Sequence, residues 1–300
     1  MARKHKVVFL RSIIPHTASA YYFKGMQKQD VDLIEIPFDP HQPQPDMEFP
    51  DADLLLMVDC GLPVDFPGLK CYRNPKGYVS IDSCHKLKIH QEYCVKYEFD
   101  YIWVAQKNMV SELGSNATWL PLAADEDIHV YKPSTTIHTG LLRKILRRNH
   151  YDIGMCAAPY KHRRRFEKLF KKAGLSTNFY FRKKFGKTVA YEIALCTIGF
   201  NAGAGFNNDK GQDINMRVFE TMANGKAMLL TNSYDSLGYE ELFEEKQHYV
   251  SFKSEEEAVE KALYYAKNSA EASCIAQEGQ SQILSNHTYA HRCRKILSVL

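Results

Sequence analysis

Short, unbroken apolar runs recur in both halves of this sequence, and they restrict the chain to folds built on buried parallel sheets. Strands covered by helices on both faces read as continuous apolar stretches of about four to eight residues. Segments of helical or loop character separate the runs, so strand and helix alternate in each half. We therefore predict an α/β protein with two parallel-sheet domains that face a cleft. The strongest runs are KVVFL at 6–10, DLLLMV at 53–58, YDIGMC at 151–156, EIALCTIGF at 192–200 and AMLL at 227–230.

The length of the chain and a change of character near its middle set the expected domain boundaries. Three hundred residues correspond to about two domains. A loop-like stretch and then a basic amphipathic stretch occupy residues 131–150, after which a buried strand restarts. We expect a first domain over residues 1–135, a second over residues 149–285, and a last helix within residues 286–300. The proline-rich segment 37–50 is expected to be irregular.

The most informative polar pattern lies in residues 206–232, which read as loop, short helix, tight turn and buried strand. Asp213 or Asn215 can cap the helix, because their side-chain oxygens accept the free N–H groups of its first turn. Arg217 lies beside those N–H groups, and Glu220 follows one turn later. A helix N-terminus with an adjacent arginine suits an anion such as a diphosphate. The alternative is a capped surface helix with an Arg217–Glu220 pair, and these residues leave both interpretations open.

The same helix should end at Gly225, which can adopt the left-handed conformation of a helix stop. Its apolar face carries Met216, Phe219 and Ala223, which are expected to pack inward. Arg217, Glu220 and Asn224 share the neighbouring face, which is expected to lie outside the packed core.

Charge is distributed unevenly, although the net charge of +4 is mild. Residues 161–187 hold eleven Lys or Arg and one acidic residue, Glu167, whereas residues 235–260 hold nine acidic residues and two lysines. Three arginines at 163–165 fall in the first turns of a predicted helix, where cations oppose the helix dipole. An anionic ligand would explain that placement, so Arg163 is a candidate binding residue. The alternative is a solvated basic face.

A second candidate site follows the predicted strand YVSID at 78–82. In parallel α/β sheets, ligands bind beyond the carboxyl ends of the strands. Asp82 and His85 should lie there, and His85 could serve as a base. The alternative is that His85 only supports a structural turn.

Several classes of protein are not supported. The turn after the first strand lacks the G-x-G-x-x-G pattern of dinucleotide-binding folds. The eight cysteines show no zinc-ligand spacing, and no stretch approaches the ~20 apolar residues of a membrane span. The N-terminus lacks the apolar core of a signal peptide. We therefore expect a cytoplasmic protein with reduced cysteines.

The run DINMRVFETMANGKAMLLTN at 213–232 resembles the donor-binding segment of the CgeB-like, spore-maturation glycosyltransferases, which are group 1 enzymes of the GT-B superfamily. The similarity continues through FEE at 243–245, His248 and NHTYAHR at 286–292, and covers the first half of the chain more loosely. A D-x-x-H element similar to Asp82 and His85 recurs in the N-terminal half of that family.

The resemblance implies a GT-B fold of two Rossmann-like domains, with the last helix returning to the first domain. It implies a hexosyltransferase-like, retaining enzyme that needs no metal or other cofactor. Glu220 matches the ribose-binding glutamate, and Arg217, Asn215 and Arg163 are expected to serve the donor diphosphate. Many relatives have a second glutamate eight positions earlier, where this chain has Gln212, so Asp213 is considered for that role.

The expected partners are a nucleotide-sugar donor and an acceptor that the sequence does not identify: a glycan, a protein, a small molecule or a modified nucleic acid. Two other functions stay open. A GT-B nucleotide-sugar epimerase would share the nucleotide site and need its own acid–base groups. A nucleic-acid or anionic-surface binding module would use the basic zone 143–187, and its binding would fall steeply with salt.

Overall fold

The computed structural model describes residues 3–132, 150–181, 186–203, 206 and 213–300. The chain divides into two compact units, one formed by residues 1–123 with 288–300 and the other by residues 124–287. We call them unit 1 and unit 2. The expected domains were 1–135 and 149–285, whereas the division falls at 123/124, before the turn that follows the last strand of unit 1. In the part of the chain that the structure describes, no helix is long and apolar enough to cross a membrane.

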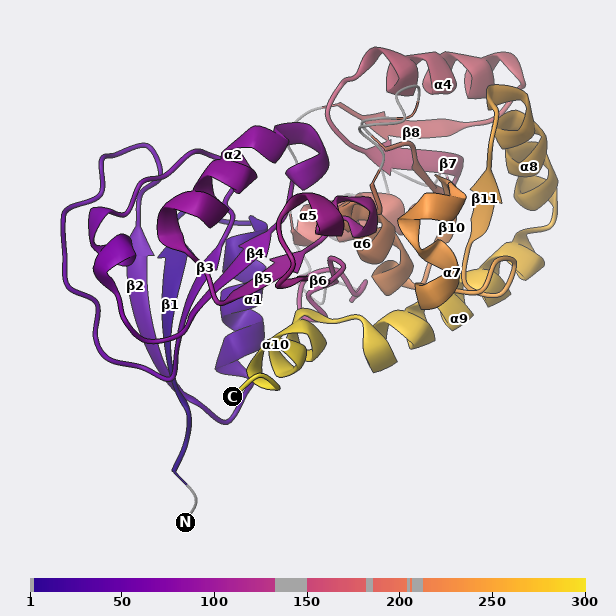
Figure 1. The fold of residues 1–300 in the computed structure, drawn as a ribbon. Coiled ribbons are helices and arrows are strands. Elements are labelled where there is room, and N and C mark those ends of the chain that lie inside the picture. The colour runs from indigo at the N-terminus through magenta and orange to yellow at the C-terminus, as the bar shows by residue number, and fades with distance from the viewer. Residues whose placement is uncertain (1–2, 133–149, 182–185, 204–205, 207–212) are drawn as a thin grey trace. The chain divides into compact units, whose positions relative to one another are not determined.

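Unit 1 is a six-stranded parallel sheet in the order β2-β1-β3-β4-β5-β6. Helix α2 packs with the short 3-10 segments η1 and η2, and its residues Tyr93 and Tyr97 join the core on one face of the sheet. Helices α1 and α10 pack together, with α1 against β1 and β3 (Figure 1). The elements are β1 (Lys6–Ser12), α1 (Ala18–Gln27), β2 (Asp32–Phe38), β3 (Leu54–Val58), η1 (Pro67–Cys71), β4 (Lys76–Ser80), α2 (Ser83–Tyr97), β5 (Tyr101–Val104), η2 (Lys107–Glu112), β6 (Ala117–Trp119) and α10 (Tyr289–Leu297).

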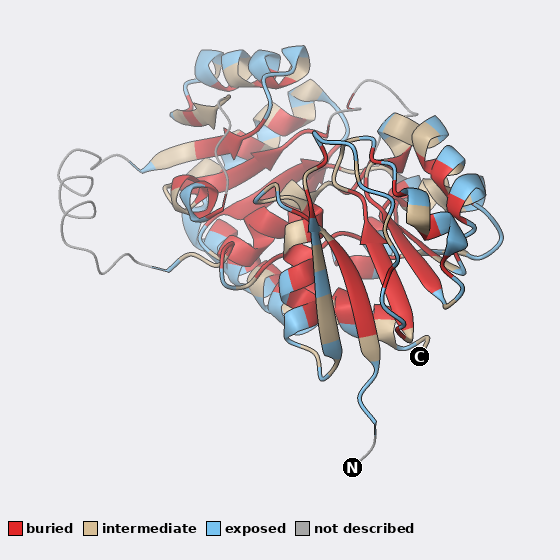
Figure 2. Ribbon diagram, turned by 90° about the vertical axis from the view of Figure 1, so that its left-hand side faces the viewer, coloured by how far each residue is buried: buried red, intermediate tan, exposed pale blue. Residues whose placement is uncertain are grey.

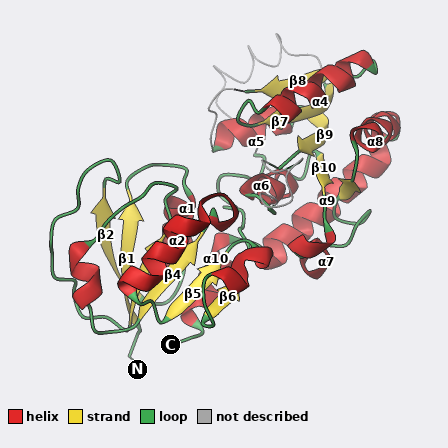
Figure 3. Cartoon of the chain, turned by 45° about the horizontal axis from the view of Figure 1, so that its top comes forward, coloured by secondary structure: helices red, strands yellow, loops and turns green. Residues whose placement is uncertain are grey.

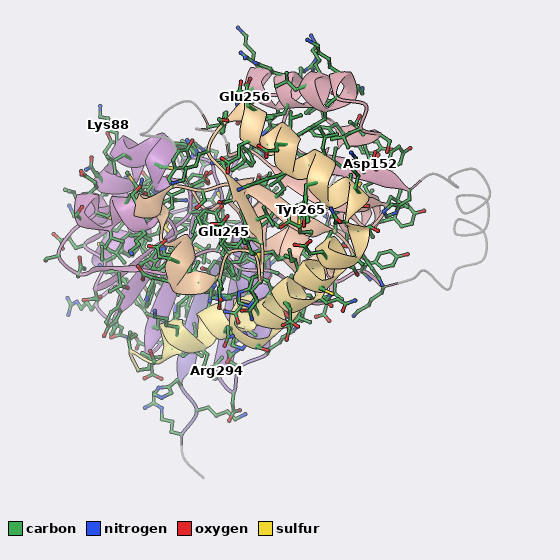
Figure 4. All side chains as sticks on the ribbon, turned by 90° about the vertical axis from the view of Figure 1, so that its right-hand side faces the viewer. Lys88, Asp152, Glu245, Glu256, Tyr265 and Arg294 are labelled. Carbon is green, nitrogen blue, oxygen red and sulfur yellow. The ribbon has the colours of Figure 1, made fainter. Side chains whose placement is uncertain are left out.

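Unit 2 is a five-stranded parallel sheet in the order β11-β10-β9-β7-β8. Helices α4 and α8 pack together over one face, and α5, α6 and α9 cover other parts of the sheet (Figure 3). Figure 4 labels Glu256 and Tyr265 near the two ends of α8. The elements are β7 (Tyr151–Cys156), α4 (Lys161–Lys172), β8 (Thr177–Tyr180), α5 (Lys187–Ile193), β9 (Cys196–Asn201), α6 (Met216–Asn224), β10 (Met228–Asn232), η4 (Asp235–Leu237), α7 (Tyr239–Leu242), β11 (Val250–Phe252), α8 (Glu255–Lys267) and α9 (Ser269–Asn286).

The prediction of two parallel-sheet α/β units is confirmed, and burial explains why the apolar runs identified the strands. Every residue of β3, β9 and β10 is buried, as the red central strands of Figure 2 show. The main core of unit 2 is aromatic: Phe166 and Phe170 of α4 lie against Phe200 of β9 and Phe252 of β11. Aromatic side chains bury large apolar areas, so they contribute most of the free energy of core packing.

Three sequence expectations were wrong in detail. Segment 37–50 was expected to be wholly irregular, yet Pro37 and Phe38 complete β2. Proline is tolerated there because β2 is an edge strand, so the missing N–H leaves no ladder bond unmade. The apolar run 192–200 was expected to be one strand, but Glu192 lies in α5 and β9 begins at Cys196. The run 78–82 is also shifted, since β4 ends at Ser80.

Helix α10 is attached to α1 by close aromatic and backbone contacts. The ring of Tyr289 stacks on that of Tyr21, with centroids 5.4 Å apart, and meets Tyr22 edge-on at 5.0 Å. Gly25 faces the Tyr289 backbone so closely that a Cβ atom at this position would lie 2.6 Å from the carbonyl oxygen. The buried guanidinium of Arg292 donates to the carbonyls of Pro121 and Leu122 at 2.7 and 3.0 Å.

A buried polar cluster lies below the carboxyl ends of β3 and β4. Nδ1 of His90 lies 2.7 Å from the Tyr78 hydroxyl and 3.0 Å from that of Ser80, while Nε2 lies 3.9 Å from Oδ2 of Asp59. Burial lowers the pKa of His90 to about 4 and raises the pKa of Asp59. The native state therefore keeps this imidazole neutral, so that Nδ1 can accept a hydroxyl hydrogen.

Replacing Gly25 with alanine should destabilise the protein. The clash with the Tyr289 carbonyl forces α1 and α10 apart, and such overpacking costs about 1–3 kcal/mol. That loss exceeds the ~1 kcal/mol gained in helix propensity. We expect Tm to fall by a few degrees in a thermal unfolding experiment. Gln27→Ala, at an exposed position of the same helix, should leave Tm unchanged; a Gly25→Ala protein as stable as wild type would contradict the described packing.

Acidification should cost stability through His90. Its folded pKa lies below the unfolded value of about 6.5, so below pH 6.5 the unfolded chain binds a proton that the native state does not. Stability is then lost as the pH falls from 6.5 to about 4, by roughly 2 kcal/mol at pH 5. The raised pKa values of Asp59 and Asp82 act in the opposite sense.

The test compares wild type with His90→Asn, which does not titrate and keeps an acceptor near the Nδ1 position. Denaturant unfolding at pH 7, 6 and 5 should show a smaller loss of stability in the variant. Parallel pH profiles for the two proteins would show that His90 does not contribute to the loss.

Candidate functional site

The order of strands in unit 2 places a topological switch point between β7 and β9. The chain proceeds from β7 to β8 on one side and then returns to β9 on the other, so the connections after β7 and β9 leave in opposite directions. In open parallel sheets this switch point is where ligands bind. The residues that follow the two strands, Ala157–Ala158 and Ala202–Gly203, therefore frame a candidate site.

Arg163, in the first turn of α4, spans this switch point. Its Nε donates to the carbonyl of Ala202 after β9 at 2.9 Å, and Nη1 donates to that of Ala158 after β7 at 3.3 Å. Its guanidinium also lies over the ring of Tyr160, 4.7 Å from the centroid. The residue is 5% exposed. Arg163 therefore places a positive charge at a buried position, which its two hydrogen bonds to carbonyl oxygens fix.

A second arginine lies close enough to affect the first. Burial, and to a smaller extent the neighbouring Arg217, lower the pKa of Arg163 to about 10, while Tyr160 and Asp213 raise it by less. The group stays charged at neutral pH even at this value. Nε of Arg217 is itself buried and makes no hydrogen bond. Two cations in one partly buried place are unfavourable unless an anion offsets them.

Helix α6 begins at the same place. Of the two predicted caps, the structure selects Asn215, whose Oδ1 accepts from the backbone N–H of Arg217 at 3.1 Å. Asn215 has extended backbone geometry, and Gly225 ends the helix with a φ of 70°, as its sequence position predicted. The first turn of α6 carries no acidic residue, so its remaining N–H groups and the helix dipole favour an added anion.

Polar side chains surround Gly203 at the end of β9. Its N–H donates to Oδ1 of Asn232 at 2.8 Å. A Cβ atom built on Gly203 would lie 3.5 Å from Oδ1 of Asp213 and 3.7 Å from Nδ2 of Asn215. Nδ2 of Asn215 and Oδ1 of the nearby strand residue Asn201 are buried without a hydrogen-bond partner. Buried polar atoms are normally bonded, so orphaned ones concentrated at one strand edge point to a ligand.

Glu220 lies one turn further along α6, and its side chain is buried. The expectation that its helix face is unpacked was wrong, since Glu220 is 8% and Asn224 1% exposed. Nδ2 of Asn224 donates to the Ala190 carbonyl of α5 at 2.7 Å, so α5 covers this face. The Arg217–Glu220 pair of the alternative interpretation is also absent from the ion pairs of the described residues. Oε1 of Glu220 lies instead 3.4 Å from Nε2 of the buried His129.

Asp82 and His85 lie together in unit 1, after β4 and at the start of α2. Asp82 occupies the N-cap position, and its carbonyl accepts from the N–H of His85 at 2.9 Å. Burial raises the pKa of Asp82, with the nearby Asp59 acting in the same direction. His85 is exposed in the first turn of the helix. The pair thus follows the end of β4, with Asp82 at the N-cap and His85 in the first turn of α2.

Sequence reasoning missed four polar residues of these sites. Asn201 and Asn232 each end an apolar strand, where a single polar residue is a weak signal. His129 follows Asp125 by four residues, and only this spacing could have indicated a contact. Asp59 follows β3 at the switch point of unit 1, between β1 and β3, which no local pattern reveals.

Three Asp-x-Asp strings occur in the sequence, at 30–32, 51–53 and 125–127, and such strings hold metals in some enzymes. Asp32 and Asp53 lie at or beside the amino ends of β2 and β3, away from the edge where ligands bind. The carboxylate of Asp53 accepts from the N–H of Lys6 at 2.8 Å. Asp125 accepts from the N–H of Asp127 at 2.9 Å in a turn. These contacts give the carboxylates of Asp53 and Asp125 structural roles.

The basic zone is partly accounted for by contacts inside unit 2. Arg165 pairs with Glu255 at 2.7 Å, and Lys171 pairs with Glu167 at 2.6 Å. Arg164 lies over the ring of Phe181. Residues 143–149 and 182–185 of this zone, and Gln212, lie outside the described residues.

A sequence model described as glycosyl transferase-like matches residues 143–298, which is more than half of the chain. No curated protein matches the sequence. Among solved structures, Anabaena Alr3699/HepE in complex with UDP and glucose has 12% identity and a TM-score of 0.65, with 99% of this chain and 100% of that chain covered.

Two further structures match over nearly their whole length. An alpha-glucosyltransferase in complex with UDP-glucose and DNA containing an abasic site has 9% identity and a TM-score of 0.62, covering 98% of this chain and 99% of that one. Sucrose-phosphate synthase from Thermosynechococcus elongatus has 9% identity and a TM-score of 0.62, covering 99% and 98%. At such identities the likeness establishes the fold. The protein therefore has the GT-B fold of two Rossmann-like domains and belongs to the glycosyl transferase-like family.

Proposed function

We propose that this protein transfers a hexose from a nucleoside-diphosphate sugar to an acceptor hydroxyl, and that the donor binds at the carboxyl edge of the unit 2 sheet. The observation that carries the proposal is the placement of Arg163 and Arg217 together at the β7–β9 switch point, beside the start of α6. A diphosphate has the charge that two arginines and a helix N-terminus accommodate. The UDP and UDP-glucose complexes of structurally similar proteins support UDP as the first nucleotide to test.

The chemistry assigns a role to each part of the site. During transfer the bond between the anomeric carbon and the diphosphate oxygen breaks, and its electron pair moves onto the diphosphate. The acceptor oxygen bonds to the anomeric carbon, and its proton passes to His85 or to the departing diphosphate. Arg163, Arg217 and the α6 N–H groups stabilise the charge that grows on the leaving group, an effect worth several kcal/mol. Glu220 accepts hydrogen bonds from the ribose hydroxyls.

The finer parts of the proposal rest on the sequence resemblance and on position. Asp213 and Asn215 lie beside Gly203 and are assigned to the donor sugar and diphosphate. Asp82 and His85 are assigned to the acceptor or the transferred sugar. We also propose a CgeB-like enzyme that retains the anomeric configuration and works without a metal. All eight cysteines are free thiols, which supports a reducing compartment such as the cytoplasm.

Removing Arg217 should weaken UDP binding about ten- to a hundredfold, since a hydrogen bond to a charged group contributes about 1.5–3 kcal/mol. Isothermal titration of UDP into wild type and Arg217→Ala measures the effect, and Arg217→Lys should retain part of the affinity. The matched control is Arg165→Ala, which removes an exposed arginine of α4 that pairs with Glu255 and should change nothing. Equal affinities for all four proteins would refute the proposed donor site.

His85→Ala should slow sugar transfer while leaving the donor affinity intact. A general base contributes about 10²–10⁴-fold to the rate, and His85 belongs to unit 1 rather than to the donor-binding residues of unit 2. The measurement is release of UDP from the UDP-sugar that best stabilises the protein in a thermal-shift panel. If His85→Ala releases UDP as fast as wild type, His85 has only a structural role.

A further inference from the structure

His129 ends a tight turn near the start of unit 2, formed by residues 125–129, which we call the linker turn. The turn runs from Asp125 to His129, and the N–H of His129 donates to the Asp125 carbonyl at 2.8 Å. The N–H of Asp125 in turn donates a hydrogen bond to Nδ1 of the His129 ring at 2.9 Å. Both residues are buried, with exposures of 3% and 1%. The orientation of the imidazole is thus fixed by the backbone of its own turn.

These bonds determine which ring nitrogen carries the proton. Because Nδ1 accepts from a backbone N–H, it must present its lone pair, and the neutral ring then carries hydrogen on Nε2. Nε2 lies 3.4 Å from Oε1 of Glu220, slightly longer than an ordinary N–H···O bond. The geometry of this contact falls short of a hydrogen bond, but it places the Nε2–H of the neutral ring next to one oxygen of the carboxylate.

We propose that His129 is a positioning residue that orients the carboxylate of Glu220 for the two ribose hydroxyls of the nucleotide. This inference rests on the proposed function, in which Glu220 binds the ribose. A carboxylate on a flexible side chain recognises a diol only if both its position and its rotation are fixed. His129 holds Oε1 from the side of the linker turn, and α6 holds the backbone of Glu220.

Further contacts connect the linker turn to the candidate donor site. The N–H of Ala124, next to the turn, donates to the His287 carbonyl at 3.0 Å, and the ring of His287 lies against that of Phe219 of α6, 6.2 Å between centroids. The turn that carries His129 is thus attached to the helix that carries Glu220 at two points. His129 does not itself touch the nucleotide.

The decisive comparison is between UDP and 2′-deoxy-UDP. Wild type should bind UDP about ten- to a hundredfold more tightly, since the deoxynucleotide lacks one hydroxyl that bonds the charged carboxylate. His129→Ala should reduce this preference severalfold, as should Glu220→Gln. The double variant should show no smaller preference than Glu220→Gln alone, because His129 acts through Glu220. The control is His150→Ala, which removes an exposed histidine of the same unit.

Rescue by a conservative variant separates positioning from a general loss of structure. His129→Gln places an amide N–H near the position of Nε2 and should restore part of the preference for the ribonucleotide. His129→Asn, which is too short to do so, should resemble His129→Ala. Nitrogen-15 NMR of the ring in the ligand-free protein should show the Nε2–H tautomer.

The outcomes distinguish this inference from the proposed function. A wild-type protein that binds UDP no better than 2′-deoxy-UDP would overturn the ribose role of Glu220. A normal wild-type preference that survives unchanged in a folded His129→Ala protein would overturn the role of His129 alone, as would an Nδ1–H tautomer.

Discussion

The candidate donor site depends on one interaction, the bonds of the Arg163 guanidinium to the ends of two neighbouring strands. The carbonyls of Ala158 and Ala202 lie where β7 and β9 diverge, and the guanidinium of Arg163 donates to both. A positive charge therefore lies at the switch point. Because five donors sit on a planar guanidinium, it can bond these carbonyls and still offer hydrogens to a ligand. The buried charge of Arg163 at the switch point of the sheet is therefore the reason that we propose an anionic ligand there.

The site is also more enclosed than its sequence indicated. Glu220 and Asn224 lie under α5 and next to the linker turn, so the polar face of α6 is part of the packed interior. A buried carboxylate needs polar neighbours, and Nε2 of His129 lies 3.4 Å from Oε1 of Glu220. Substitutions at Glu220 therefore affect packing as well as binding, and an isosteric change such as Glu220→Gln is the informative one.

The sequence predicted the parts that are encoded locally. Buried strands such as β3 and β10 are unbroken apolar runs, and the Asn215 cap and Gly225 stop delimit α6 through their own backbone chemistry. Helices α2 and α9 were missed because their apolar residues are interrupted by polar ones. The contacts of His129, Asn201 and Asn232 join segments 29 or more residues apart and arise only from the order of the strands, which no local pattern contains.

The most direct test of this account is a crystal structure of the full chain with UDP. The account predicts that the diphosphate oxygens lie within hydrogen-bond distance of the guanidinium groups of Arg163 and Arg217 and of the first N–H groups of α6. It also predicts that the ribose hydroxyls bond the carboxylate of Glu220. A well-ordered nucleotide bound elsewhere, with these groups making no contact to it, would contradict the central claim.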